Sequence, residues 1–151
     1  MKICTSTQRW PHLFSIQETL QKHAEAGFDA IDLSLYDLEK TTILDSPNYL
    51  EQAAIIRDMA SSNGLEILQA HAPFSHHWTG EEGIARVIRS IEVCGVAHIP
   101  NIVVHPCFLG DRQYNEKQKE YFDINVSYYN RLRPYAEKAG VNIAIENMFV
   151  W

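Results

Sequence analysis

The sequence is poor in cysteine and has no long apolar run. Its 151 residues include three cysteines, Cys4, Cys94 and Cys107, whose spacing is not that of a metal site and whose odd number does not suit a disulfide framework. No apolar stretch approaches the ~20 residues of a membrane-spanning helix, and the N-terminus lacks the layout of a signal peptide. These absences predict a cytoplasmic protein with reduced thiols and no membrane partner.

Positive charge is also scarce. The chain has 13 Lys and Arg against 19 Asp and Glu, which gives a net charge of -6 at pH 7. Because nucleic-acid binders neutralise phosphates with basic surfaces, this balance argues against a nucleic-acid partner. No glycine-rich phosphate-binding fingerprint follows the first predicted strand, which disfavours a dinucleotide cofactor. The length and the 46% hydrophobic content are typical of one domain, residues 1–151.

Two periodicities alternate along the chain. Short apolar runs predict five strands, at residues 2–6, 30–35, 65–71, 101–105 and 141–147. Four amphipathic segments between them predict helices: one opened by a capping box at Ser15 and Glu18 and ended by Gly27, one beginning at Ser46 and Pro47, one at 81–94, and one from about 115 to 139. The second helix is expected to bury a stripe made of Leu50, Ala54, Ile55 and Met59.

The order of these elements is strand then helix, four times, followed by a last strand. This pattern predicts a parallel sheet with crossover helices, either an open doubly wound sheet or a closed barrel. In the second strand, Asp32 and Ser34 alternate with apolar residues and therefore share the face away from the helices. Polar residues on that face favour a barrel interior, because an open sheet covered on both faces has near-continuous apolar strands.

Three predicted strands end in residues that bind metals. His71 ends the third strand, His105 the fourth, and Glu146 lies near the end of the fifth. The carboxyl ends of parallel strands lie on one side of a barrel, and neighbouring strands are about 4.8 Å apart. We therefore expect the three side chains to point into one shared cleft. Imidazole nitrogen and carboxylate oxygen suit a divalent metal, Zn²⁺ or Mn²⁺.

Other candidate residues have two open interpretations. The loop after the third strand, with His76, His77 and Trp78, either lines a pocket or is exposed. Asp32 and Ser34 either contact substrate or form a hydrogen-bonded inner layer of the barrel. Nothing marks Cys107 as a nucleophile, and the remaining histidines are predicted to lie at the surface or in helix packing: His12, His23 and His98.

Four segments resemble the xylose-isomerase-like TIM barrel superfamily, which includes sugar phosphate isomerases and epimerases and the endonuclease IV group. They are AGFDAIDLSL at the second strand, HAPF at the third, IVVHP at the fourth, and YAEKAGVNIAIENM leading into the fifth. Their order and spacing carry the resemblance across the whole chain. It implies an α/β fold of the (β/α)8 TIM-barrel type, here incomplete, with about five parallel strands and four helices.

The resemblance also implies roles for individual residues. Glu146 aligns with a divalent-metal ligand of the family that also acts as an acid/base in the sugar epimerases. His71 and His105 resemble zinc-binding positions of the endonuclease IV group, and in sugar-converting members such positions line the substrate pocket. Apart from the resemblance, we expect His76 to contact substrate oxygens as well, and Asn147, beside Glu146, to orient Glu146 or the substrate. The implied function is a metal-dependent isomerase or epimerase of a small sugar or sugar phosphate. The alternatives are an endonuclease IV-like zinc phosphodiesterase and a non-catalytic half-barrel that self-associates.

The length sets these 151 residues apart from a complete barrel, which has about 250. Three strands of the family's barrel, and with them an Asp, a His and a second Glu ligand, have no counterpart in this sequence. We therefore expect a single, truncated barrel domain that binds metal weakly or not at all and is inactive alone. Its unpaired strand edges and an open inner face, with Val103 and Ala144 exposed, predict a homo-oligomer, most simply a dimer.

Overall fold

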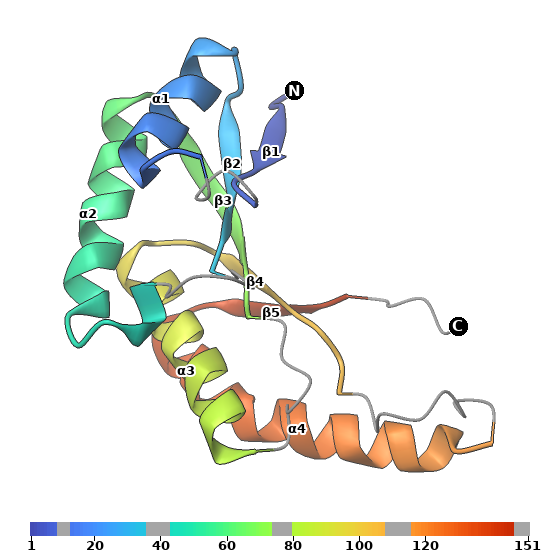
Figure 1. Cartoon of the computed structure of the whole chain (residues 1–151). Coiled ribbons are helices and arrows are strands. Elements are labelled where there is room, and N and C mark those ends of the chain that lie inside the picture. Colours follow the sequence, from blue (N-terminus) through green and yellow to red (C-terminus); the bar gives the residue numbers. More distant parts are fainter. Residues whose placement is uncertain (9–12, 36–42, 74–79, 108–115, 147–151) are drawn as a thin grey trace.

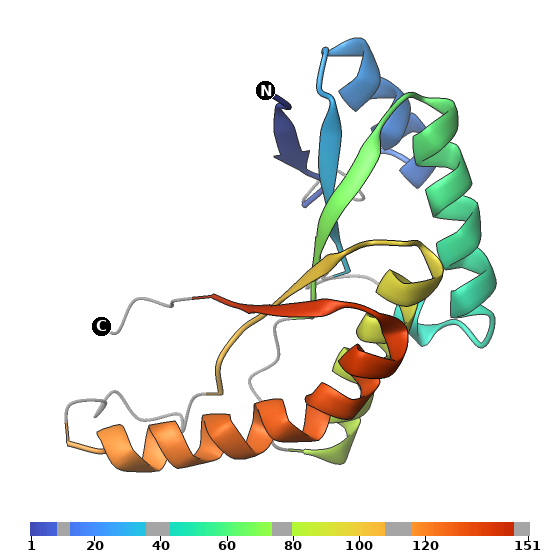
Figure 2. The ribbon, with the colours of Figure 1, turned by 180° about the vertical axis from the view of Figure 1, so that it is seen from behind.

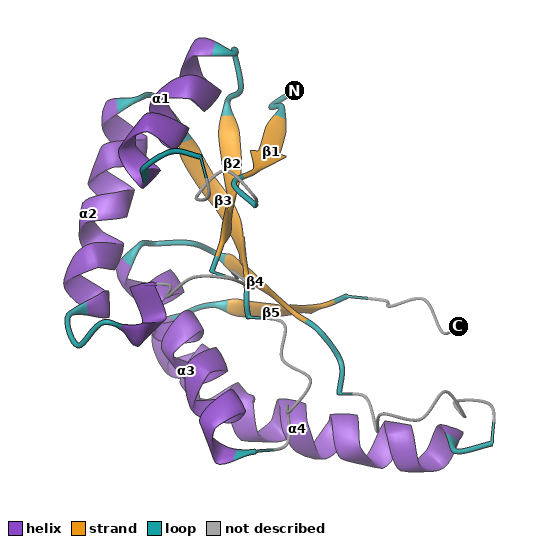
Figure 3. Cartoon of the chain, in the orientation of Figure 1, coloured by secondary structure: helices purple, strands orange, loops and turns teal. Residues whose placement is uncertain are grey.

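Strands and helices alternate along the chain (Figures 1 and 3). The computed structural model describes residues 1–8, 13–35, 43–73, 80–107 and 116–146. The strands are β1 (Cys4–Ser6), β2 (Ala30–Ser34), β3 (Glu66–His71), β4 (Asn101–Val104) and β5 (Asn142–Ile145). The helices are α1 (Ile16–Glu25), α2 (Tyr49–Ser62), α3 (Glu81–Val96) and α4 (Gln118–Ala139), with a short 3-10 helix, η2 (Ile43–Asp45), before α2. No helix in these described ranges is long and apolar enough to cross a membrane.

The five strands form one parallel sheet in the order β1-β2-β3-β4-β5. Each strand is therefore added on the same side of the one before it. Because crossover connections between parallel strands are right-handed, this order places every helix on the same face of the sheet. Figures 1 and 2 show the four helices following one another around that outer face of a strongly twisted sheet. The arrangement is the first five strands of a (β/α)8 barrel, as the sequence predicts.

The main hydrophobic core lies between the outer face of the sheet and the helices. Its members include Leu33, Ile102 and Val104 from the strands and Ile91 from α3, each at most 3% exposed. The apolar side of α3 packs against it, with Ile84, Val87 and Ile91 buried and Ile88 partly buried. This core fixes the strands from one side only and leaves the inner face for the polar residues that form the site.

The predicted burial of α2 is wrong at two of its four residues, Leu50 and Ile55, while Ala54 and Met59 are partly buried. The helix begins at Tyr49, so Pro47 precedes it, and its buried residues are Ala53, Ile56 and Ala60. In the predicted stripe, by contrast, Leu50 is 39% exposed and Ile55 is 45% exposed. Apolar residues occur nearly all around this helix, so the sequence pattern does not select one face. The contacts with β3 and α3 select it instead.

The inner face of the sheet is less open than expected. Ala144 is exposed, as predicted, but Val103 is only 8% exposed and the prediction for it is wrong. Val103 lies in register with His71 on one side and with Ala144 on the other. The neighbouring strands therefore cover a small β-branched side chain on this strongly twisted sheet without any further chain.

The pairing of β2 with β3 contains a one-residue shift of register. Ile31 pairs with Ile67, but the next residue, Asp32, pairs with Gln69, so that Leu68 is an extra residue on β3. The side chain of Asn101 donates a hydrogen bond of 3.3 Å to the Leu68 carbonyl oxygen. This contact gives the displaced peptide group a partner, which a bulge otherwise leaves unpaired.

Candidate metal centre

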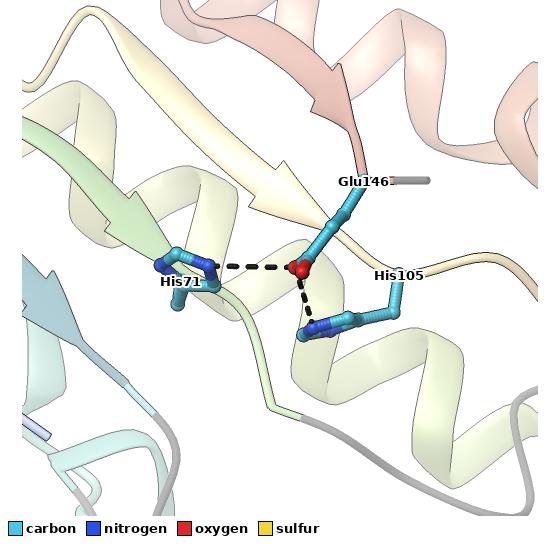
Figure 4. Close-up of side chains that lie close together, drawn as sticks. All are labelled: His71, His105 and Glu146. Atoms are coloured by element: carbon cyan, nitrogen blue, oxygen red, sulfur yellow. Dashed lines mark ion pairs between the residues drawn. The ribbon is translucent and has the colours of Figure 1, made fainter. Parts of the chain in front are cut away.

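His71, His105 and Glu146 meet at the carboxyl edge of the sheet (Figure 4). His71 is the last residue of β3, His105 follows β4 directly, and Glu146 follows β5 directly. Their possible ligand atoms, the imidazole nitrogens and a carboxylate oxygen, all lie within 4.8 Å of one another. The predicted convergence of the three side chains is thus what the fold produces, because parallel neighbouring strands end at the same edge.

One carboxylate oxygen faces both imidazole rings. Glu146 Oε2 is 3.0 Å from His105 Nε2 and 3.6 Å from His71 Nε2. The ring centroids of the two histidines are 5.9 Å apart. Donor atoms that share one tetrahedral zinc ion lie about 3.3 Å apart, given Zn–N and Zn–O distances of ~2.0 to 2.1 Å. The two distances from Glu146 Oε2 are therefore close to those between donor atoms that share one cation.

The opposite side of the His71 ring shows which nitrogen is available. His71 Nδ1 lies 2.8 and 3.0 Å from the two carboxylate oxygens of Asp32. A carboxylate only accepts hydrogen bonds, so Nδ1 carries the proton and donates it. In the neutral ring Nε2 is then an acceptor, and it faces another acceptor, Glu146 Oε2. Two acceptors facing each other require a cation or a further proton between them, so the donor set fits a metal ion.

The two histidines have opposite shifts of pKa. The hydrogen bond to Asp32 raises the pKa of His71 above its ordinary value, against the effect of burial. Burial lowers the pKa of His105, and the nearby carboxylate of Glu146 opposes that effect. A neutral imidazole is the metal-binding form, so His105 is already favoured in that form. The hydrogen bond to Asp32 both orients the His71 ring and favours its protonated form.

Helix α4 fixes the segment that carries His105. The Tyr129 hydroxyl donates a hydrogen bond of 3.1 Å to the Val104 carbonyl oxygen. The side chain of Asn125 accepts from the Cys107 backbone N–H at 2.7 Å and donates to the Cys107 carbonyl oxygen at 3.2 Å. These contacts hold the chain on both sides of His105. No sequence pattern marks Asn125 and Tyr129, because an amphipathic helix does not reveal which loop its polar residues contact.

Comparison with known proteins identifies the family. Residues 20–151 match the family model described as xylose isomerase-like TIM barrel. The chain belongs to the xylose isomerase-like TIM barrel family. The match covers α2, all of the strands from β2 to β5, and the three candidate ligands. The comparison with curated proteins gave no match.

Solved structures of this barrel family resemble the chain over nearly its whole length. A D-psicose 3-epimerase crystallised in the presence of D-fructose has a TM-score of 0.72 and 21% identity. The match covers 98% of this chain and 53% of the epimerase chain. A D-tagatose 3-epimerase-like protein has a TM-score of 0.67 at 28% identity, with the same coverage of 98% and 53%. The IolI protein with a bound zinc atom has a TM-score of 0.64 at 18% identity, and covers 96% and 51%. The chain thus spans about half the length of the structures it matches.

The other candidates from the sequence are placed as follows in this half of a xylose isomerase-like barrel. Asp32 forms a hydrogen bond with His71, and Ser34 pairs with His71 in the register of β2 and β3. Cys107 is 1% exposed, and burial raises the pKa of its thiol to about 12, which does not suit a nucleophile. His23 is buried in helix packing and His98 is exposed, as predicted. The remaining predicted residues lie outside the described part of the chain: His12, His76, His77, Trp78 and Asn147.

Proposed function

We propose that the chain carries the first half of the active site of a metal-dependent sugar isomerase or epimerase. Glu146, His71 and His105 would hold the divalent cation, Zn²⁺ or Mn²⁺. The observation that carries the proposal is the single carboxylate oxygen that faces two imidazole nitrogens at 3.0 and 3.6 Å. Membership of the xylose isomerase-like family and the 28% identity to a D-tagatose 3-epimerase-like protein support a small sugar as the substrate.

In the proposed reaction a proton leaves and returns to a carbon beside a carbonyl group. A bound divalent cation would supply Lewis-acid polarisation of that carbonyl and its neighbouring hydroxyl. Glu146 uses Oε2 toward the histidines, so its second oxygen is the one we assign to moving the proton at the carbon. His71 and His105 hold their rings at the edge of the sheet and keep the carboxylate in position. His76 and Asn147 are assigned to contacts with the substrate's hydroxyl or phosphate oxygens.

Metal binding by Glu146→Gln tests the proposal directly. We expect the parent chain to bind Zn²⁺ or Mn²⁺ weakly but measurably in a calorimetric titration. The variant should lose at least about tenfold in affinity, because an amide is neutral and a poorer ligand than a carboxylate. Glu82→Gln is the matched control, since Glu82 lies in the exposed first turn of α3. Equal affinity in all three proteins would contradict the assignment of Glu146.

Sugar binding tests the substrate class separately. We expect saturation-transfer NMR to detect a ketose such as D-fructose bound to the metal-loaded chain, and to lose the signal when a chelator is added. We expect no epimerised product from these 151 residues, because proton transfer on both faces of a carbon needs a second group. Epimerised product whose formation depends on Glu146 would show that the chain is active by itself.

A zinc phosphodiesterase acting on abasic DNA is the second candidate. The pair of imidazoles favours it, since two histidines and one carboxylate are a zinc-binding set. The net charge of -6 argues against it, because tight DNA binding depends on neutralising phosphates. Cleavage of an abasic oligonucleotide by the zinc-loaded chain, abolished in His105→Gln, would favour this candidate over the sugar isomerase.

A further inference from the structure

The extra residue on β3 decides which way its last residues point. Paired residues of parallel strands share a face of the sheet, and a shift of one residue moves each following side chain to the other face. Before the shift, Ala30 pairs with Glu66 and Ile31 with Ile67; after it, Asp32 pairs with Gln69 and Ser34 with His71. Without the register shift, Asp32 would pair with Leu68 and share a face with Leu68 and Ala70.

The shift therefore brings Asp32, Gln69 and His71 onto the same inner face. Ala70, between the two polar residues of β3, is fully buried in the core on the outer face together with Leu33. Uninterrupted alternation from Ile67, whose side chain packs against the same core, would send Gln69 and His71 outward as well. The bulge thus keeps the apolar residues in the core and redirects the polar ones toward the site.

Asp32 is held by two contacts on this inner face. Its carboxylate accepts the His71 Nδ1 proton, and Oδ2 also accepts a hydrogen bond of 2.7 Å from Gln69 Nε2. The Asp32 side chain is 10% exposed, against 30% for His71. A largely buried carboxylate that accepts from two donors has a fixed position. It can therefore fix the ring that it contacts.

We propose that Asp32 is a positioning residue that locks His71 in the Nδ1–H tautomer, so that the Nε2 lone pair points to Glu146 and His105. The bulge at Leu68 makes this contact geometrically possible. The inference deepens the proposed function and rests on it for the identity of the metal site. Carboxylates behind metal-binding histidines fix ring orientation and tautomer, and their loss typically lowers metal affinity 10- to 100-fold.

The tautomer of His71 can be read without any metal. Long-range ¹H–¹⁵N correlation spectra of histidine-labelled apo chain distinguish a protonated Nδ1 from a protonated Nε2, and His71→Gln assigns the signal among the seven histidines. At a pH where the ring is neutral, we expect Nδ1–H in the parent and the Nε2–H form, which water favours, in Asp32→Ala. Asp29→Asn is the control, because Asp29 precedes the same strand but bonds the Ile3 backbone N–H.

Zinc affinity gives the second readout. We expect a 10- to 100-fold loss in Asp32→Ala, a smaller loss in Asp32→Asn, which keeps the size and one acceptor oxygen, and none in Asp29→Asn. If Asp32→Ala keeps the Nδ1–H tautomer and its zinc affinity stays within twofold of the parent, Asp32 has no positioning role. A folded parent that binds no zinc contradicts the proposed metal site, and its His71 tautomer still decides the role of Asp32. Circular dichroism shows whether both Asp32 variants are folded. If Asp32→Ala is unfolded, the tautomer and zinc affinity of Asp32→Asn decide the role of Asp32.

Discussion

The cysteines show how strongly the fold controls a side chain's chemistry. Cys94 and Cys107 are at most 1% exposed, and burial raises the pKa of each thiol to about 12. Cys4 lies exposed on the edge strand β1, and partial burial raises the pKa of its thiol by less. The thiolate is the reactive form of cysteine, so these three residues of one type differ in reactivity because of their positions alone.

We expect one thiol per native chain to react readily with a thiol reagent near pH 8. With a pKa of about 12, only about one thiol in 10⁴ is ionised at that pH, and burial blocks access further. Ellman's reagent should therefore modify Cys4 at least about 100-fold faster than the other two, and all three in denaturant. Cys4→Ser is the control and should remove the fast phase. A fast phase that persists in Cys4→Ser would mean that the segment around Cys107 opens readily.

At the scale of single elements, helix α1 shows a local signal that the structure reproduces in full. The backbone N–H of Ser15 donates to Glu18 Oε2 at 2.9 Å, and the Glu18 N–H donates to Ser15 Oγ at 3.2 Å, which completes the capping box. The hydrogen bonds from Ser15 lower the pKa of Glu18. These contacts join residues three positions apart, so tertiary packing has little influence on them.

Ser15→Ala should lower the free energy of unfolding by about 1 kcal/mol, because the first turn of α1 loses its side-chain acceptor. The pKa of Glu18 is lower in the folded chain than in the unfolded one, so its contribution is present above the unfolded pKa. That contribution is lost as the pH falls through the folded value. Urea unfolding of Ser15→Ala at several pH values, with Glu25→Gln at the other end of α1 as control, measures both effects. An unchanged midpoint in Ser15→Ala at neutral pH would contradict the prediction.

Helix α2 shows the opposite case. Its sequence carries apolar residues on several sides. In the expected stripe Leu50 and Ile55 are exposed, whereas Ala54 and Met59 are partly buried. Ala53, Ile56 and Ala60 are buried instead. Ala53 and Ile56 belong to the main core, and Ala60 packs in a smaller cluster with Leu20 and Ile31. In α3 the apolar residues recur on one side of the helix, and Ile84, Val87 and Ile91 on that side are buried. A sequence pattern thus predicts a helix face only where one side of the helix is distinctly polar.

Considered as a whole molecule, the sheet has two edges. Among the described strands, β1 and β5 each pair with one neighbour only. Ile145, the last residue of β5, is 57% exposed, and Ala144 beside it is exposed as well. An edge with unpaired N–H and C=O groups and apolar side chains is a site of association. We therefore propose that the 151-residue chain forms a homodimer through the β5 edge.

Light scattering over a concentration series measures this association. We expect a dimer for the parent and a shift toward monomer in Ile145→Lys, because a charged residue on an edge strand opposes pairing. Phe122→Lys is the matched control, since Phe122 is 68% exposed on the outer helix α4 and should leave the dimer intact. A folded parent that is monomeric at every concentration would exclude self-association, and equal effects of both substitutions would place the contact elsewhere.

The sequence by itself determined the order of the elements, their parallel arrangement and the strand ends that carry His71, His105 and Glu146. These follow from local periodicity, capping residues and the rule that parallel strands share their carboxyl edge. Only the tertiary structure decided that Asp32 faces His71, because the pairing of β2 with β3 gains an extra residue at Leu68 that no local pattern signals. A register shift is set by which contacts two strands make across space. The face on which the last polar residues of β3 lie is therefore set by the pairing of β2 with β3 and not by the sequence of β3 alone.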